Sequence, residues 1–284
     1  MIYDTPKDWL AAPDQRVTFF GMSGLGKTHL AQLLRDAGGW FHYSIDYRIG
    51  TAYMGEHIAD NLKRHAMQVP LLADLLRSDS IYIGSNITFG NLAPLSTYLG
   101  KPGDPARGGL PIAEYRRRQA LHRRAEVNAL LDTPAFIDRA RELYGYDRFV
   151  CDTGGSICEV VDPTDPRDEV LRTLSGATLL CWIKGDETHA GTLKARFDRA
   201  PKPMYYRPEI LDTLWARHGG DETDPDAFAR LGYSALIDAR QPRYAAMAAN
   251  WGVTVRAEDA ATARDAADVT ALVADAIGKA TRRA

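Results

Sequence analysis

The chain has 284 residues, of which 45% are hydrophobic and 25% are charged, and its formal net charge at pH 7 is -2. This is the composition of an ordinary globular protein with enough apolar residues for a core, and it excludes a disordered, collagen-like or fibrous chain. The near balance of charge gives the whole protein no attraction to nucleic acid or to an anionic membrane. The length predicts one large domain, residues 1–284, that carries a sizeable insertion.

The cysteines and the first residues of the chain bear on the compartment. Cys151, Cys158 and Cys181 are an odd number with no C-x-x-C spacing, so a disulfide framework or a cysteine zinc site is not expected. Residues 1–15 lack the basic start and the apolar run of a signal peptide. No stretch reaches the roughly 20 apolar residues of a membrane span. We therefore expect a cytoplasmic protein without a membrane partner.

Short apolar runs predict the strands of a central sheet. They are residues 16–20 (RVTFF), 40–46 (WFHYSID), 148–153 (RFVCDT) and 177–183 (ATLLCWI). After the first run, Leu30, Leu33 and Leu34 recur at helical spacing. Because strands that alternate with helices pair in parallel, the sequence predicts an α/β fold of three layers, with helices on both faces of a parallel sheet.

About a hundred residues separate the second and third predicted strands, which is too long for a plain crossover. They contain helical patterns at 58–77 and 114–131, the run 80–90 and a Pro/Gly-rich loop at 100–111. We predict that residues 51–135 form a mostly helical inserted subdomain, a cap that contributes to substrate binding. At the other end of the chain, Val269 and Ile277 lie on one face of a predicted C-terminal helix within 257–284.

Residues 21–28, GMSGLGKT, match the Walker A pattern G-x-x-x-x-G-K-[ST] of a phosphate-binding loop (P-loop), between a predicted strand and a predicted helix. The glycines let the backbone fold around an anion, and the backbone amides are reinforced by the positive end of the helix. Lys27 can reach the β- and γ-phosphates, and the Thr28 hydroxyl can bind Mg²⁺. We therefore predict ATP and Mg²⁺ as cofactors, bound by Gly21, Met22, Ser23, Gly24, Leu25, Gly26, Lys27, Thr28 and His29. The His29 side chain itself is expected to pack or to face solvent.

The loop alone does not distinguish a kinase from a switch or a motor. The chain has no N-K-x-D motif to read guanine, which disfavours a GTPase. It also lacks the long apolar run ending in Asp-Glu that is typical of helicases and AAA+ motors. The function must therefore be inferred from residues at the ends of the other strands.

Two aspartates end predicted strands, Asp46 after the second and Asp152 after the third. Ligands bind at the carboxyl edge of open α/β sheets. Asp46 can orient the proton of an attacking hydroxyl group, or it can cap the next helix. Asp152 suits a carboxylate that holds Mg²⁺ through water, or it is an ordinary turn residue. Gly154 and Gly155 follow it and would let the backbone come close to a substrate.

The order of these motifs resembles the shikimate kinase and gluconate kinase group, small P-loop kinases related to the nucleoside monophosphate kinases. After the P-loop come D-x-x-I at 46–49, T-G-G at 153–155 and R-x-P-x-Y at 240–244. The resemblance covers residues 16–50 and 136–255. It implies a P-loop NTPase fold and transfer of a phosphoryl group from ATP to a small molecule.

The resemblance also implies roles for single residues. Asp46 matches the acceptor-binding segment, and Arg139 lies in a helix similar to the group's F-R-x-x-E helix. Arg196 takes the place of a lid arginine, with Arg199 as the alternative, and Arg240 matches an acceptor-binding arginine at a helix start. The predicted catalytic residues are Lys27, Asp46, Arg196 and Arg240, the predicted substrate-binding residues are Asp46, Arg139, Gly154, Gly155 and Arg240, and the predicted metal ligands are Thr28 and Asp152.

The chain departs from the group in three ways, one of which is that Ser156 stands where the group has the third glycine of G-G-G. Ser44 replaces the first aspartate of a D-x-D motif, which transfers more of the Mg²⁺ coordination to Asp152 and Thr28. Residues 51–135 have no counterpart in the group. They are long enough to rebuild the acceptor pocket, so transfer to a small molecule is carried over from the resemblance and shikimate as the acceptor is not. The matches of Arg240 and Arg139 imply that the acceptor is anionic.

A basic segment lies inside the insertion. Residues 101–124 contain seven Lys or Arg and two acidic residues, a local net charge of +5. They either recognise phosphate on an acceptor, a nucleotide or RNA, or form a solvated helix face. Because of the basic segment 114–124, a nucleic-acid partner stays possible in this prediction. The segment lacks the interleaved aromatic residues of single-strand binding, which makes such a partner less expected.

Two functions from different classes are carried forward. The first is a kinase that transfers the γ-phosphate of ATP to a hydroxyl group of a small anionic metabolite. The alternative is a regulatory nucleotide-binding ATPase whose nucleotide state controls a protein or RNA partner. An oligomeric ATPase that supplies an arginine to a neighbouring subunit is disfavoured by the lack of motor motifs, and the oligomeric state is not predicted.

Overall fold

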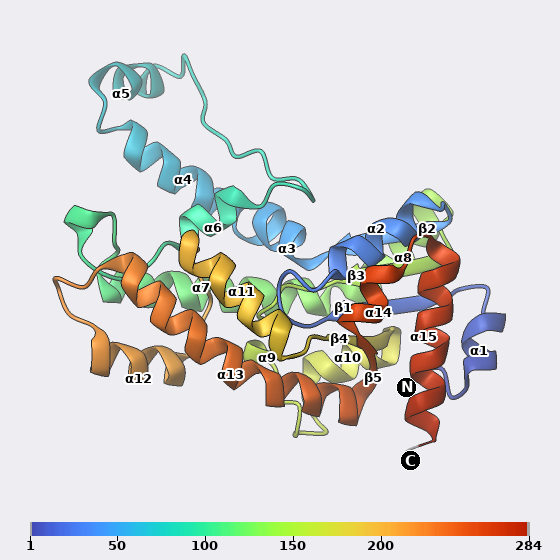
Figure 1. Ribbon diagram of the computed structural model, residues 1–284. Helices are drawn as coiled ribbons and strands as arrows, with labels where there is room; N and C mark the ends of the chain where they lie inside the picture. The colour runs from blue at the N-terminus through green and yellow to red at the C-terminus, as the bar shows by residue number, and fades with distance from the viewer. Residues whose placement is uncertain (1, 283–284) are drawn as a thin grey trace. The chain divides into compact units, whose positions relative to one another are not determined.

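The computed structural model describes residues 2–282, apart from the side chain of Glu187. The chain clusters into two compact units, whose elements are labelled in Figure 1. Unit 1 comprises Met1–Ile45, Val127–Ala200 and Leu231–Ala284, and unit 2 comprises Asp46–Glu126 and Pro201–Arg230. Unit 2 therefore differs from the insertion that we predicted at 51–135, because a second segment from later in the chain folds with it.

A parallel sheet forms the centre of unit 1, and among the described residues it has five strands in the order β2-β3-β1-β4-β5. The strands are β1 (Arg16–Phe20), β2 (Trp40–Ser44), β3 (Arg148–Asp152), β4 (Leu179–Lys184) and β5 (Gly252–Arg256). Four of them lie where the sequence predicts strands, and the predicted fold class is confirmed. β2 ends at Ser44 and not at Asp46, because Ile45 begins helix α3 (Ile45–Arg48).

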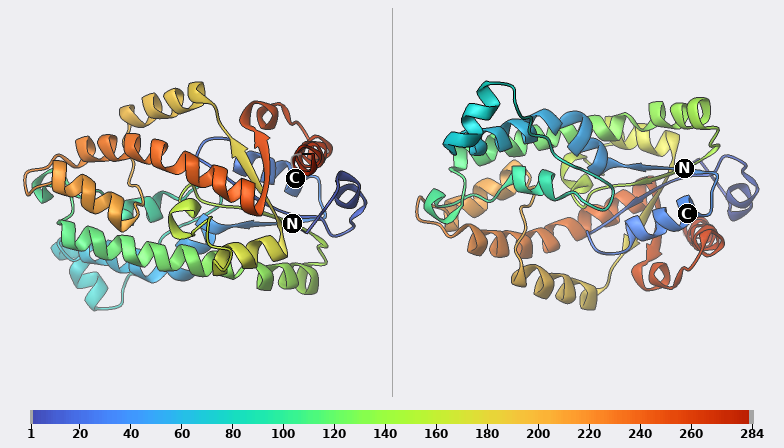
Figure 2. Two further views of the ribbon diagram at one scale, coloured as in Figure 1. Left: turned by 90° about the horizontal axis from the view of Figure 1, so that it is seen from below. Right: turned by 90° about the horizontal axis from the view of Figure 1, so that it is seen from above.

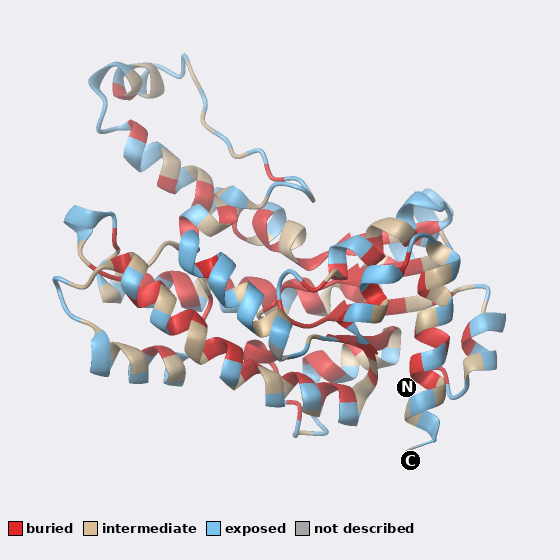
Figure 3. Cartoon of the chain, viewed as in Figure 1, coloured by how far each residue is buried: buried red, intermediate tan, exposed pale blue. Residues whose placement is uncertain are grey.

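The sheet is buried on both faces, as its uninterrupted apolar runs require. In β1 every residue from Val17 to Phe20 is buried (Figure 3). The register pairs Asp152 with Phe19 on one side and with Ser44 on the other. The carboxyl ends of β2, β3 and β1 therefore lie next to one another, and the Gly-rich loop directly follows β1.

Helices cover both faces of this sheet, as the two views in Figure 2 show. One face carries α2 (Lys27–Asp36) and α15 (Ala266–Thr281), and the other carries α8 (Thr133–Tyr144) and α10 (Glu169–Ala177). The remaining helices wholly within unit 1 are α1 (Pro6–Ala11), α9 (Ile157–Val160), α11 (Glu187–Arg199) and α14 (Ala257–Thr262). The helix predicted at 257–284 is thus two helices, α14 and α15, and Asp265 caps the second by accepting a hydrogen bond from the Asp268 amide.

Two long helices belong partly to each unit, α7 (Ile112–Leu131) and α13 (Pro225–Trp251). The motif at 240–244 lies in the interior of α13, with Pro242 inside the helix. Our placement of Arg240 at a helix start was therefore wrong. Proline is tolerated here although it removes one backbone donor, since the helix is long and its inner face is anchored by packing, with Tyr244 against Phe20 and Trp182.

Unit 2 is mostly helical. Its elements are a π-helical turn (Ile49–Tyr53), α4 (Gly55–Ala66), α5 (Pro70–Arg77), α6 (Ala93–Leu99), a 3₁₀ turn (Pro105–Arg107), α12 (Pro208–His218) and the first parts of α7 and α13. The single helical pattern predicted at 58–77 is divided into α4 and α5. The run at 80–90 forms no strand and contributes one isolated bridge, between Thr88 and Asn91.

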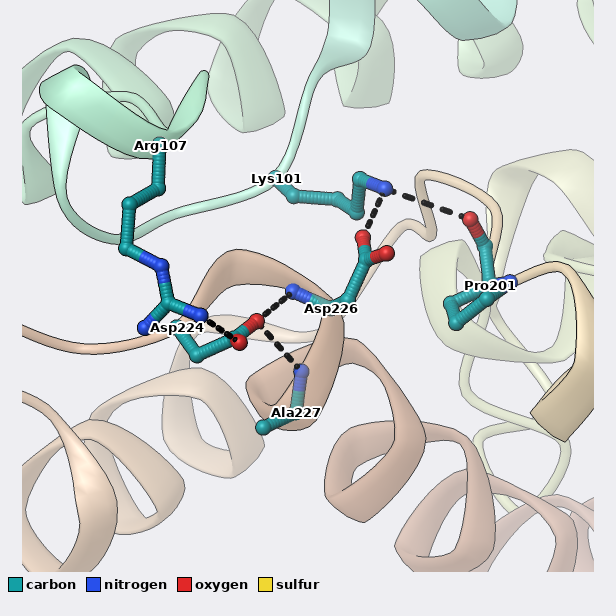
Figure 4. A network of polar contacts seen from close by, with 6 residues as sticks. All are labelled: Lys101, Arg107, Pro201, Asp224, Asp226 and Ala227. Atoms are coloured by element: carbon teal, nitrogen blue, oxygen red, sulfur yellow. Dashed lines mark hydrogen bonds and ion pairs between the residues drawn. The ribbon is translucent and has the colours of Figure 1, made fainter.

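Ion pairs join the two segments of unit 2 (Figure 4). Lys101 pairs with Asp226 and also donates to the Pro201 carbonyl at 3.3 Å, and Arg107 pairs with Asp224. Asp224 accepts hydrogen bonds from the Asp226 and Ala227 amides, at 2.8 and 3.0 Å, at the first turn of α13. These long-range pairs explain why residues 201–230 fold with the predicted insertion.

Two further observations bear on the chain as a whole. The three cysteines are buried and form no disulfide with one another. Within residues 2–282, none of the helices combines the length and the apolar character needed to cross a bilayer.

Candidate phosphate-binding site

The loop between β1 and α2 turns sharply, and its glycines make the turn possible. The φ angles of Gly21, Gly24 and Gly26 are +137°, +87° and +94°, values that residues with a Cβ atom rarely adopt. A Cβ atom on Gly21 would lie 2.7 Å from the Ile183 carbonyl oxygen of β4. At Gly26, the residue before α2, a Cβ atom would meet nothing within 4 Å. The first glycine is thus needed for packing as well as for conformation.

This difference leads to a prediction for stability. Gly21→Ala should lower the free energy of unfolding by about 1–3 kcal/mol for the backbone conformation, and by a further 1–3 kcal/mol or so for the clash with Ile183. Gly26→Ala should cost only about 1–2 kcal/mol, because only the conformation is strained. Urea unfolding of both variants without nucleotide measures the difference. Equal losses would show that the close approach to β4 is unimportant.

Lys27 begins α2 and folds back over its own loop. Its ammonium group donates to the Gly21 and Met22 carbonyl oxygens, at 2.9 Å each, and the residue is only 7% exposed. The loop is therefore closed around its own cation. To meet a phosphate group, Lys27 must share or exchange these carbonyl contacts.

Met22 and Leu25 are buried, so their side chains belong to the core and any part they take in binding falls to their backbone. His29 Nε2 lies 3.4 Å from the Ala263 carbonyl oxygen. This contact agrees with the expectation that the side chain packs and is not catalytic.

Asp152 lies at the centre of a polar cluster beside the loop. It accepts hydrogen bonds from the Thr28 hydroxyl at 2.8 Å and from His42 Nε2 at 3.2 Å. Burial acts to raise the pKa of Asp152, but hydrogen bonds from His42, Thr28 and Ser44 and the charge of His42 outweigh it, so the pKa lies below its ordinary value. The carboxylate is therefore ionised at neutral pH.

Alternation along the strands explains how the cluster forms. Side chains two residues apart on a strand share a face, so His42 and Ser44 on β2 lie on the same face. Ser44 is directly opposite Asp152 in the register, so all three side chains face α2, which carries Thr28. The sequence analysis predicted Asp152 and Thr28 and missed His42. A histidine two residues before a strand end was the available signal, but the register that pairs it with Asp152 cannot be read from one sequence.

The T-G-G segment after β3 contacts the loop. The Thr153 amide and hydroxyl both donate to the Phe19 carbonyl oxygen, at 3.1 and 3.2 Å, which joins the ends of β3 and β1. A Cβ atom on Gly155 would lie 2.6 Å from Ser23 Oγ. Gly155 thus lies against the loop, and the Tyr244 hydroxyl donates to its carbonyl oxygen.

Helix α11 contacts the first half of the loop through Leu193. A Cβ atom on Gly24 would be 3.0 Å from Leu193 Cδ2, so the Leu193 side chain packs on the backbone of Gly24. Further along α11, the Phe197 ring stacks on Tyr233 of α13 with ring centres 3.9 Å apart. Arg196 and Arg199 are exposed in the last turn. Because residues three apart share a helix face, Arg196 lies on the side of Leu193 and Arg199 does not.

Arg240 is in a different environment from the one that we predicted. It is 2% exposed, and its Nε donates to Glu159 Oε1 of α9 at 2.9 Å. Glu159 is also buried. A buried ion pair of this kind holds α13 against α9. Any contact of Arg240 with an acceptor would require this pair to open or to be shared, so that role stays a prediction.

The pair predicts a large effect on stability. Glu159→Gln should lower the free energy of unfolding by about 3–5 kcal/mol, because it leaves the Arg240 charge buried without its counterion. The double variant Glu159→Leu/Arg240→Met should recover most of that loss, since it removes both charges. Urea unfolding measures both. A Glu159→Gln variant within 1 kcal/mol or so of the wild type would mean that the guanidinium is already compensated by other groups.

Two other predicted site residues lie on helices α8 and α3. Arg139 is exposed on α8, where its guanidinium carbon lies 5.3 Å from the ring centre of Phe136, and α8 covers the face opposite α2. Asp46 is half-buried in the first turn of α3 and belongs to unit 2. Their substrate-binding roles stay predictions.

Comparisons with known proteins give a likeness among solved structures. No protein-family model matches the chain, and no curated protein matches it. Among solved structures, the chain is similar to a shikimate kinase from Bacteroides thetaiotaomicron at 14% sequence identity and a TM-score of 0.37, with 95% of each chain covered. That structure is from the group which the motif order resembles. The parallel sheet, and the Gly-rich loop that leads from its middle strand into α2, establish the fold independently. The chain has a P-loop α/β fold.

Proposed function

We propose that the chain is an ATP-dependent phosphotransferase that transfers the γ-phosphate to a hydroxyl group of a small, anionic metabolite. The observation that carries the proposal is the meeting of the GMSGLGKT loop with the Thr28–Asp152 pair at the carboxyl end of the central strands. A phosphate-binding loop and an ionised carboxylate side by side are the parts that phosphoryl transfer needs.

The loop residues fit a triphosphate. The glycine conformations expose backbone amides around the N-terminus of α2, where an anion is favoured by unpaired N–H groups and by the helix dipole. Lys27 already lies inside the loop and would neutralise phosphate charge there. Gly155 lies against Ser23, so the backbone after β3 forms the adjoining wall.

The Thr28 hydroxyl and the Asp152 carboxylate fit Mg²⁺, which prefers hard oxygen ligands and retains several waters. When bound, Mg²⁺ would neutralise charge on the β- and γ-phosphates. His42 supports this role, since its hydrogen bond to Asp152 Oδ1 fixes the orientation of the carboxylate.

The remaining roles belong to side chains outside the loop. Arg196, on the side of α11 that faces Gly24, would close over the phosphates and stabilise the charge that develops during transfer. Asp46 would orient the acceptor hydroxyl, and Arg240 would bind the acceptor's anionic group after leaving Glu159; both roles are carried over from the resemblance. We expect the protein to act in the cytoplasm.

The test is whether ATP is consumed only in the presence of an acceptor. The full chain with Mg-ATP is incubated with a panel of hydroxylated carboxylates and phosphate esters, and ADP formation is followed. A phosphotransferase should form ADP with one class of acceptor and very little without it. Slow hydrolysis that no acceptor accelerates, together with nucleotide-dependent binding of a protein or RNA, would contradict the proposal and support the regulatory alternative.

A further inference from the structure

A cavity within unit 2 is lined by basic residues of α4 and α7. Its volume is about 720 Å³, which lies in the range of small-molecule sites. It is lined by Asn61, Arg64, His65, Gln68, Leu110, Glu114, Arg117 and Arg118. Arg64 and His65 lie three and four residues after Asn61, and Arg117 and Arg118 lie three and four residues after Glu114. Each helix therefore presents one continuous face to the cavity.

Arg118 is the buried cation of this cavity. It is 7% exposed, and it donates to Glu114 Oε1 at 2.8 Å, to Asn61 Oδ1 at 2.9 Å and to the Tyr98 carbonyl oxygen. Each Arg118 nitrogen makes one of these hydrogen bonds, and the guanidinium carbon lies 4.7 Å from the Tyr98 ring centre. A guanidinium group has five N–H donors, so two N–H groups remain beyond these bonds. Burial of a cation that retains unused donors beside a cavity favours an anionic ligand.

The fixed charges of the cavity also favour an anion. Glu114 accepts from Arg117 at 2.7 and 2.8 Å and from Arg118 as well. Hydrogen bonds from Arg117 lower the pKa of Glu114 to about 2, so it stays ionised and holds both arginines in place. Three arginines against one glutamate leave an excess of two positive charges. That excess equals the charge of a phosphate dianion.

We propose that this cavity binds the phosphoryl group of a small phosphorylated molecule, with Arg118 at its buried side and Arg64 and Arg117 at its exposed side. Of the basic segment at 101–124, Arg117 and Arg118 would then serve this site, while Arg123 and Arg124 are exposed on α7. This site is separate from the phosphate-binding loop in sequence and lies wholly within unit 2, so the proposal does not depend on phosphotransferase activity.

The test uses pyrophosphate as the probe, titrated calorimetrically into the full chain without Mg²⁺. Arg64→Gln and Arg117→Gln should each weaken binding about tenfold, the loss expected for one charge-assisted contact. Lys63→Gln and Arg116→Gln are matched controls, because their side chains are 49% and 48% exposed, as Arg117 is at 49%, and neither lines the cavity. Both controls should leave this binding within twofold of the wild type. Because pyrophosphate also fits the loop, the titrations are repeated in a Lys27→Ala background, where binding to the cavity should stay within twofold.

The outcomes separate the alternatives. Binding that is lost in Lys27→Ala and retained in Arg64→Gln and Arg117→Gln would assign the probe to the loop and overturn the proposal. Equal losses in the variants and their controls would overturn it as general charge attraction. A cavity that prefers citrate to pyrophosphate, or one that binds only an RNA oligomer, would also overturn it. An Arg64→Gln variant that has a lower melting temperature and an unchanged titration would show that Arg64 only complements the C-terminus of α4, and would overturn the proposed site.

Discussion

Lys27→Ala is expected to weaken binding of Mg-ATP at least about tenfold and to lower turnover by about 10²–10³. The ammonium group lies inside the loop, on the Gly21 and Met22 carbonyl oxygens, where the phosphate charge would be placed. Its loss removes a cation at that point. Calorimetric titration with Mg-ATP measures the first effect, and ADP formation with an acceptor from the panel measures the second.

Lys184→Ala is the control, because Lys184 is an exposed lysine that ends the neighbouring strand β4. It should bind Mg-ATP within twofold of the wild type. The Lys27 variant also leaves two loop carbonyl groups without a donor, so a loss of about 1–3 kcal/mol in the free energy of unfolding is expected. A Lys27→Ala variant that is folded and binds Mg-ATP as tightly as the wild type would remove the basis of the proposed function.

Arg196→Ala is expected to reduce turnover by about 10³-fold, while the affinity for Mg-ATP changes less than about threefold. An arginine that stabilises charge developing during transfer contributes mainly to the transition state and little to the ground state. The Leu193 side chain lies over Gly24, and Arg196 follows one helical turn later on the same side of α11, which is the basis for assigning it the lid role. Single-turnover measurements alongside nucleotide titration separate the two effects.

Arg199→Ala is the matched control for Arg196. Both arginines are exposed in the last turn of α11, and only Arg196 shares a face with Leu193. If Arg199→Ala loses turnover and Arg196→Ala does not, the assignment passes to Arg199. Equal losses of affinity and turnover in Arg196→Ala would indicate a role in nucleotide binding and not in transfer.

The central strands could be predicted because each is a short, uninterrupted apolar run. β1 and β3 lie where the sequence places them to within one residue, since both are buried on both faces. β5 was missed because Gly252–Arg256 has only two buried residues, Val253 and Val255, at the edge of the sheet. The end of β2 was misplaced by two residues, because the apolar pattern continues through Ile45 into α3.

Interactions between residues distant in sequence could not be predicted. The buried pair of Arg240 with Glu159 joins residues 81 positions apart, and residues 201–230 fold with unit 2 through Lys101 and Arg107. Neither leaves a local pattern, because an ion pair places no constraint on the residues next to it in the chain.

By itself, the sequence determined the α/β class and the phosphate-binding loop, and it indicated Thr28 and Asp152 separately as candidate metal ligands. Each of these follows from local spacing, since a strand, a glycine turn and a helix start are specified by adjacent residues. Only the tertiary structure decided that His42 orients Asp152, that Arg240 is occupied by Glu159, and that Arg118 is buried beside a cavity. Those outcomes depend on strand register and on which helix faces meet, which are set by packing of the whole chain.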